Sequence, residues 1–161
     1  GLVLCALVIW LAVNDVARRT IKADGVARYM AACLLAGYFW LLVAGVVWSL
    51  GNPMASGAYD TVVHAVFLGF TMSMIMAHAP TILPAVLAID LPYRKAMWLP
   101  ALLLHAGLLI RLWVGNGFGL HLAWQAGGVV NVCALLLFVL VVLASALLAG
   151  KPAVAFRKGN Q

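Results

Sequence analysis

Five long apolar stretches constrain the fold of this chain more than any other feature of its sequence. They cover residues 1–13, about 29–50, about 61–89, about 97–114 and about 120–149. All but the first are long enough to cross a bilayer, which takes about 20 helical residues. Because they lack the period-2 alternation of strands and exceed strand length, only helices fit. We therefore predict an all-α, polytopic membrane helix bundle with about five transmembrane helices.

The composition supports an integral membrane protein with one transmembrane helical domain over residues 1–161. Hydrophobic residues make up 66% of the chain and charged residues only 9%. A soluble domain of this size cannot bury that much apolar surface. The cysteines Cys5, Cys33 and Cys133 lie in apolar runs without a CxxC or CxxCH pattern. This argues against a zinc ribbon and against a covalently attached c-type haem.

The first apolar stretch is short for a membrane span, because only 13 residues precede Asn14. It shows no basic segment or cleavage site of the kind that a secretory signal needs. We expect that the N-terminus is truncated, or that these are the last helices of a longer protein. The expected partners are therefore the lipid bilayer and either other membrane subunits or a missing N-terminal part.

Positive charge follows alternate loops, which predicts the orientation of the chain. The basic segments are loop 14–28, loop 90–96 with Arg94 and Lys95, and the tail with Lys151, Arg157 and Lys158, whereas loops 51–60 and 115–119 carry no Lys or Arg. Basic loops stay on the cytoplasmic side. We predict an outside N-terminus and a cytoplasmic C-terminus in the bacterial cytoplasmic (inner) membrane. The net charge of +6 thus reflects topology and not nucleic-acid binding.

Four histidines stand out in these apolar stretches, where ionisable groups usually mark function. His64 and His78 share the third stretch, His105 lies in the fourth and His121 begins the fifth. A spacing of 14 residues returns to within about 40° of the same helix face, about 21 Å further along. His64 is then near the outer surface and His78 in the inner half.

The histidines fall into two pairs at matching depths. His78 lies 12 residues before Asp90 and His105 lies ten residues after Lys95, so both are roughly 15–18 Å from the cytoplasmic boundary. His121 reaches the level of His64 because the fifth helix begins at the outer face. Two axial imidazoles at each of two levels are the layout of two b-type haems. We therefore predict haem b as cofactor.

Two other residues extend this candidate site. Arg111 lies one to two turns outward from His105, where its charge can neutralise a haem propionate or snorkel to the interface. Met74 shares a helix face with His78 at a spacing of four residues. Thioether and imidazole ligands suit cuprous copper. A metal site of His78, His105 and Met74 is therefore the alternative to haem, in a copper-binding or copper-transport membrane protein.

The third stretch resembles the NnrS family of multi-spanning bacterial membrane proteins. The resemblance rests on the pattern H-A-x3-G-x4-M at His64, Ala65, Gly69 and Met74, with a second histidine further along. That family is described as haem- and copper-containing and is tied to nitric oxide and nitrosative stress. The resemblance implies that His64 and His78 are haem or metal ligands.

The sequence leaves little room for acid–base chemistry inside the membrane. The four acids, Asp15, Asp24, Asp60 and Asp90, all fall at predicted loops or helix ends, with Asp60 as an N-cap of the third helix. No glycine-rich phosphate loop or Walker pattern is present. Whether the protein is an enzyme is left open by these observations.

These patterns favour a haem-binding integral membrane protein that performs electron transfer or nitric-oxide-related redox handling. Its expected site residues are His64, His78, His105, His121 and Arg111. Besides the copper protein, a non-catalytic accessory subunit of a respiratory or photosynthetic membrane complex is a further alternative. Its histidines would bond to carbonyls, quinone or pigment magnesium.

Overall fold

The computed structural model describes residues 1–52 and 54–149, and within them the chain is helical with no strand. The α-helices are α1 (Leu2–Asn14), α2 (Ala17–Thr20), α3 (Val26–Leu50), α4 (Ser56–His64), α5 (Met72–Leu87), α6 (Trp98–Leu108) and α7 (His121–Leu147). Three further segments are η1 (Ala65–Thr71) and η3 (Leu109–Gly117), both π-helical, and η2 (Lys95–Met97), a 3₁₀ turn. The all-α prediction is confirmed. The basic tail residues Lys151, Arg157 and Lys158 lie outside the described residues.

Several of these elements join into continuous helices. Within the described residues, four helices are long and apolar enough to cross a membrane: Val26–Leu50, Ser56–Leu87, Lys95–Gly117 and His121–Leu147. The shortest has 23 residues, which spans about 34 Å at 1.5 Å per residue. The first apolar stretch forms the shorter helix α1, of 13 residues. The four long helices make this a membrane-protein architecture.

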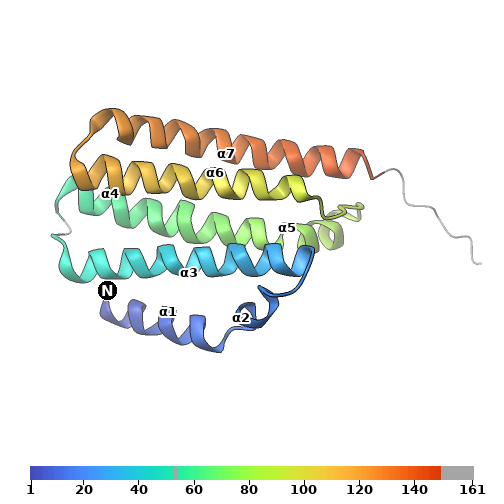
Figure 1. Cartoon of the computed structure of the whole chain (residues 1–161), viewed down its shortest axis with the longest axis horizontal. Helices are drawn as coiled ribbons and strands as arrows, with labels where there is room; N and C mark the ends of the chain where they lie inside the picture. The colour runs from blue at the N-terminus through green and yellow to red at the C-terminus, as the bar shows by residue number, and fades with distance from the viewer. Residues whose placement is uncertain (53, 150–161) are drawn as a thin grey trace, which may run out of the picture.

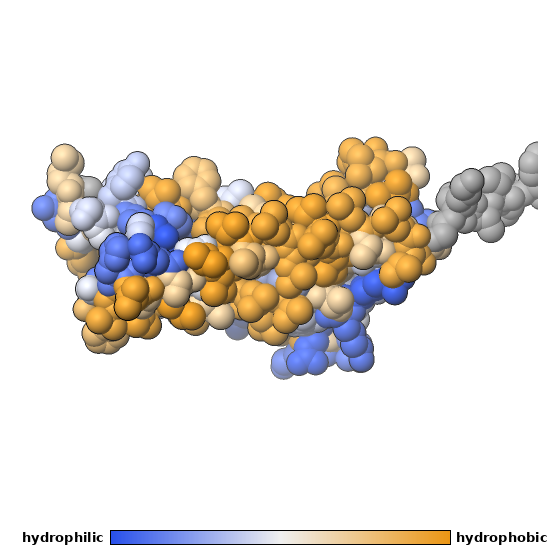
Figure 2. Space-filling model, turned by 90° about the horizontal axis from the view of Figure 1, so that it is seen from above, coloured by the Kyte–Doolittle hydropathy of each residue, from blue (hydrophilic) through white to orange (hydrophobic). Residues whose placement is uncertain are grey.

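The long helices lie side by side and run in alternating directions (Figure 1). Helix α3 packs against α1 on one side and against η1 and α5 on the other, while α7 packs along α6 and η3. The largest fully buried side chains include Trp40, Tyr29 and Met76. The surface in Figure 2 carries an apolar middle with hydrophilic groups toward both ends. Such a surface suits a bilayer, whose core is apolar and whose interfaces are wet.

Glycines allow the helices to approach closely at two levels. A Cβ atom on Gly127 of α7 would lie 2.6 Å from the backbone nitrogen of Arg111, and Gly69 of η1 lies directly against the Trp40 side chain of α3. A larger side chain at either position collides with backbone or with a buried ring. These glycines therefore serve helix packing, as small residues commonly do in membranes.

The turn after α1 is fastened to α3 by one carboxylate. Asp15 accepts a hydrogen bond from the backbone nitrogen of Ala17 at 2.8 Å and from the hydroxyl of Tyr38 at 2.6 Å. The Tyr38 bond joins residues 23 positions apart and holds α1 beside α3. Because its acceptor is ionised, it is stronger than a neutral hydrogen bond.

We expect Tyr38→Phe to lower the free energy of unfolding by about 1–2 kcal/mol, because the charge-assisted bond to Asp15 is lost while the buried ring stays. Tyr59→Phe is the matched control, since Tyr59 is 66% exposed. Thermal unfolding in detergent, followed by circular dichroism, measures both. Equal stability of the two variants would show that the Asp15 contact does not hold α1 in place.

Candidate functional site

Two π-helical segments flank the most polar part of the bundle. Segment η1 begins directly after His64, and η3 contains Arg111 and Asn116. Helix α4 packs against η3, and η3 packs along α7. π-Helical segments are uncommon and occur frequently at functional sites. The candidate site therefore lies between α4, η3 and the start of α7.

Asp60 is the centre of a hydrogen-bond network at this place, which we name the Asp60 cluster. Its Oδ1 accepts from Arg111 Nη2 at 2.7 Å, and its Oδ2 accepts from Asn116 Nδ2 at 2.8 Å and Trp124 Nε1 at 3.1 Å. The Arg111 guanidinium also lies over the Trp124 ring, 4.1 Å from its centroid. One carboxylate thus joins α4, η3 and α7 through hydrogen bonds, and the cation–π contact of Arg111 with Trp124 adds a second link between η3 and α7.

The Asp60 cluster corrects two sequence-based expectations. Helix α4 begins at Ser56 with Ala55 as N-cap, so Asp60 lies inside the helix and is not its cap. A carboxylate is therefore present within a long apolar helix, where none was expected. Its side chain is only 19% exposed and that of Arg111 only 11%. The pairing of an inward acid with an inward base explains how both are tolerated there.

His64 lies one turn after Asp60 and is oriented by it. Its Nδ1 is 2.8 Å from the Asp60 backbone oxygen and 3.1 Å from Oδ1 of the same residue. Since both oxygens only accept, Nδ1 carries the proton and Nε2 keeps a free lone pair. Metal-bound histidines are held in this way, with the second nitrogen donating to a carbonyl or carboxylate. His64 is therefore prepared to act as a ligand through Nε2.

His64 and His121 border one open pocket of about 700 Å³. The remaining lining residues include Asp60, Val63, Gly115, Asn116, Gly119 and Trp124. His121 is the first residue of α7, and its ring stacks on Trp124 with centroids 5.8 Å apart. The structure thus brings together the predicted outer histidines, which come from different helices.

His78 and His105 are held differently from each other. His78 Nδ1 lies 2.8 Å from the Met74 backbone oxygen, so its Nε2 is also free. His105 Nδ1 instead accepts a hydrogen bond from Trp40 Nε1 at 2.9 Å. The proton of a neutral His105 is then on Nε2, and neither ring nitrogen offers a lone pair to a metal. This geometry does not support His105 as a ligand. Of the predicted inner pair, only His78 keeps a free ring nitrogen.

Two of the residues suggested for copper are likewise engaged in other contacts. The terminal methyl of Met74 lies 2.8 Å from the place where Gly37 of α3 would carry a Cβ, so Met74 packs against α3. His105 is engaged with Trp40. Across residues 1–52 and 54–149, no three His, Cys, Asp or Glu side chains form a group that could hold a metal ion.

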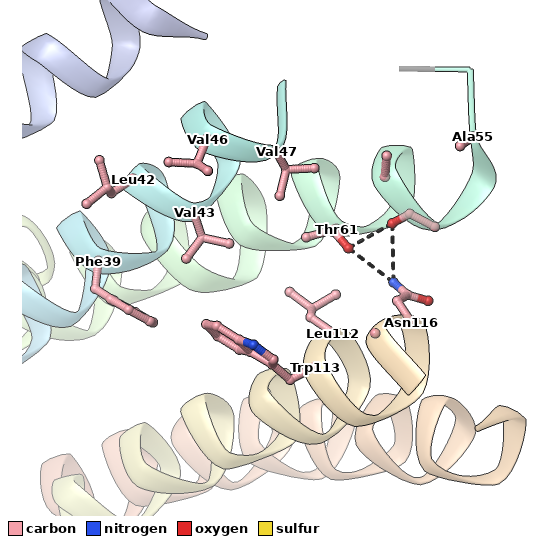
Figure 3. A pocket seen from close by; sticks show the side chains of 13 residues that line it. Phe39, Leu42, Val43, Val46, Val47, Ala55, Thr61, Leu112, Trp113 and Asn116 are labelled. Carbon is pink, nitrogen blue, oxygen red and sulfur yellow. Dashed lines mark hydrogen bonds between the residues drawn. The ribbon is translucent and has the colours of Figure 1, made fainter. Parts of the chain in front are cut away.

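A neighbouring pocket of about 580 Å³ lies between α3 and η3 (Figure 3). Its walls are apolar, and Phe39 and Trp113 stack at one end with ring centroids 6.1 Å apart. At the other end Asn116 donates to Thr61 Oγ1 at 3.2 Å and to the Gly57 backbone oxygen at 3.4 Å. The pocket is lined by no titratable side chain. Gly57 and Asn116 line both this pocket and the pocket of His64 and His121.

A family model matches residues 1–147, which include the whole Asp60 cluster and all four histidines. The chain belongs to the DUF8744 family. That family is described as a domain of unknown function. No curated protein and no solved structure matches the chain.

Proposed function

We propose that the protein is a haem-binding integral membrane protein that performs electron transfer or nitric-oxide-related redox handling. Haem b would be held in the pocket between α4 and the start of α7, with His64 and His121 as ligands. The observation that carries the proposal is the position of His64 Nδ1 beside two oxygens of Asp60, which leaves Nε2 free. The resemblance to the NnrS family points in the same direction.

The donor set fits a haem. Two histidines from separate helices would hold it, and a flat macrocycle needs a slot between helices. His64 and His121 are on separate helices and border one pocket. When bound, haem supplies a one-electron redox centre. We propose one haem at the outer level and not two stacked haems, because the hydrogen bond from Trp40 engages His105.

The surrounding residues have separate tasks in this proposal. Asp60 holds the His64 proton on Nδ1. This orients the ring and makes Nε2 a stronger electron-pair donor to a metal. Arg111 pairs with Asp60 at 2.7 Å, so it fixes the carboxylate that orients His64. His121 is exposed at the start of α7 and would be the second residue to hold the haem.

We also propose that five helices cross or enter the membrane, with the N-terminus outside and the C-terminus in the cytoplasm. Supporting this, Arg94 and Lys95 lie between α5 and α6, at the end of the bundle opposite to the start of α4. Basic loops mark the cytoplasmic side. His64 and His121 would then lie toward the outer face of a bacterial cytoplasmic membrane.

A labelling experiment tests this orientation. Asn52→Cys lies in the loop between α3 and α4, and Ala96→Cys lies in the η2 turn before α6. With Cys5, Cys33 and Cys133 replaced by Ala, we expect a membrane-impermeant maleimide to label the Asn52→Cys variant in intact cells and the Ala96→Cys variant only after lysis. The opposite pattern would reverse the topology.

The haem itself is tested by a reduced-minus-oxidised spectrum of the purified protein. We expect an α-band in the region of b-type cytochromes and haem in a pyridine extract. A spectrum without this band, together with a haem-free extract, would contradict the proposal. Elemental analysis that finds copper and no iron would favour the copper alternative.

A further inference from the structure

A polar pocket of about 520 Å³ lies at the turn between α1 and α2, toward the end of the bundle that also carries Arg94 and Lys95 (Figure 1). We name it the Arg18 pocket. The end of α1 and the start of α2 line it, with Val13, Asn14, Asp15, Val16, Arg18 and Arg19. None of these residues belongs to the proposed haem site.

The lining of the Arg18 pocket carries two positive charges and one negative charge. The negative charge is that of Asp15, whose carboxylate already accepts hydrogen bonds from a backbone nitrogen and from a tyrosine hydroxyl. In the described part of the chain the ion pairs are made by Asp60 alone, so Arg18 and Arg19 form none there. The pocket therefore favours a ligand with a negative charge.

Arg18 is held in position by the end of α1. Its Nη1 donates to the backbone oxygen of Val13 at 2.9 Å. A guanidinium has five N–H donors in a fixed fork, so the remaining donors of Arg18 stay available to a ligand. This fork matches the oxygens of a phosphate group, which it can bind through two parallel hydrogen bonds. Arg19, the next residue of α2, lines the same pocket and supplies the second charge.

An apolar surface leads from the Arg18 pocket along α1. Val13 and Val16 line the pocket and are exposed. Ile9 is also exposed and lies one turn before Val13 on the same helix face. Trp10, beside it, is exposed as well, and tryptophan is enriched where a membrane meets water. A ligand with an anionic head and an apolar tail matches both parts of this surface.

We propose that the Arg18 pocket binds an anionic phospholipid such as phosphatidylglycerol. Its phosphodiester pairs with Arg18 and Arg19, and an acyl chain lies along Val13 and Ile9. Basic residues that only set the orientation of a membrane protein need neither a pocket nor a fixed guanidinium. The inference depends neither on the haem nor on which end of the bundle is cytoplasmic.

The test is a titration of the purified full chain in detergent, read by native mass spectrometry. The ligands are phosphatidylglycerol and phosphatidylcholine with the same acyl chains. We expect saturable binding of one phosphatidylglycerol per chain, about tenfold tighter than phosphatidylcholine, because each nearby basic side chain favours an anionic lipid. Arg18→Gln combined with Arg19→Gln should abolish this preference.

Arg28→Gln combined with Lys95→Gln is the matched control. It also removes two exposed positive charges, and both lie outside the Arg18 pocket. This variant should bind both lipids as the wild type does. Millimolar inorganic phosphate should not displace the lipid, because it has no tail to contact the apolar surface.

The proposal is overturned by equal affinity for the two lipids, by an unchanged preference in the Arg18 and Arg19 variant, by an equal loss in the control, or by displacement with phosphate, which would indicate a site for a free anion. If the double variant does not fold, Arg19→Gln alone takes its place, since Arg19 is exposed. It should weaken phosphatidylglycerol binding about fivefold. The mass of each species also reports haem, so failure of either proposal is visible separately.

Discussion

Asp60→Ala is expected to lower the free energy of unfolding by about 3–5 kcal/mol, since removing one member of a buried ion pair leaves the other charge uncompensated. In this chain Arg111 would lose its partner at 2.7 Å, and Asn116 and Trp124 would lose their shared acceptor. The contacts between α4, η3 and α7 would weaken together. Thermal unfolding in detergent, followed by circular dichroism, measures the loss.

Two companion variants make this prediction specific. Asp24→Ala removes an exposed acid in the loop before α3 and should change stability by less than about 0.5 kcal/mol. Asp60→Asn combined with Arg111→Met removes both charges and should recover most of the loss caused by Asp60→Ala. If Asp60→Ala were as stable as Asp24→Ala, the Asp60 cluster would not be what joins the three segments.

His64→Ala is expected to abolish haem binding, because it removes the ligand that Asp60 orients. His121→Ala should retain haem more weakly and with an altered absorption spectrum, since one of the two residues that would hold it is lost. The absorption spectrum of each purified variant, after growth with haem precursor, gives the result. Circular dichroism of the same samples shows that the helices are intact.

The inner histidines provide the controls for this series. His105→Gln keeps an acceptor for Trp40 Nε1 and should retain wild-type haem content. His78→Ala should do the same if the protein holds one haem at the outer level. Loss of haem in either inner variant, with full retention in His64→Ala, would move the site to the inner half of the bundle.

The helices were predictable from the sequence because few backbone structures are stable for an apolar chain in a bilayer. Long runs without charge must satisfy their own backbone hydrogen bonds, and helices do so. The starts of helices were less predictable. Asp60 is a good N-cap residue, but Ser56 to Tyr59 extend the helix upstream because the loop ends at Ala55. The π-helical form of η1 and η3 has no signal in the hydrophobic pattern.

The sequence predicts the level of the candidate site along the helices but not its side-chain contacts. Counting residues from the loops places His64 and His121 at one level, and both border one pocket. Residue counts do not give the rotation of one helix relative to another. They therefore did not reveal that Trp40 on α3 donates a hydrogen bond to His105. Trp124 is typical of an interface anchor by sequence, yet it donates to Asp60. The signal that could have found the cluster is Asp60 and Arg111, an acid and a base near the outer ends of adjacent helices.

We propose that this chain holds one haem between His64 and His121. The most direct measurement is the ratio of haem to protein in the purified wild type, by pyridine haemochrome assay against quantitative amino-acid analysis. We predict about one haem b per chain, from two axial histidines per iron. A ratio near zero after expression with ample haem would contradict the claim, and a ratio near two would contradict the single site.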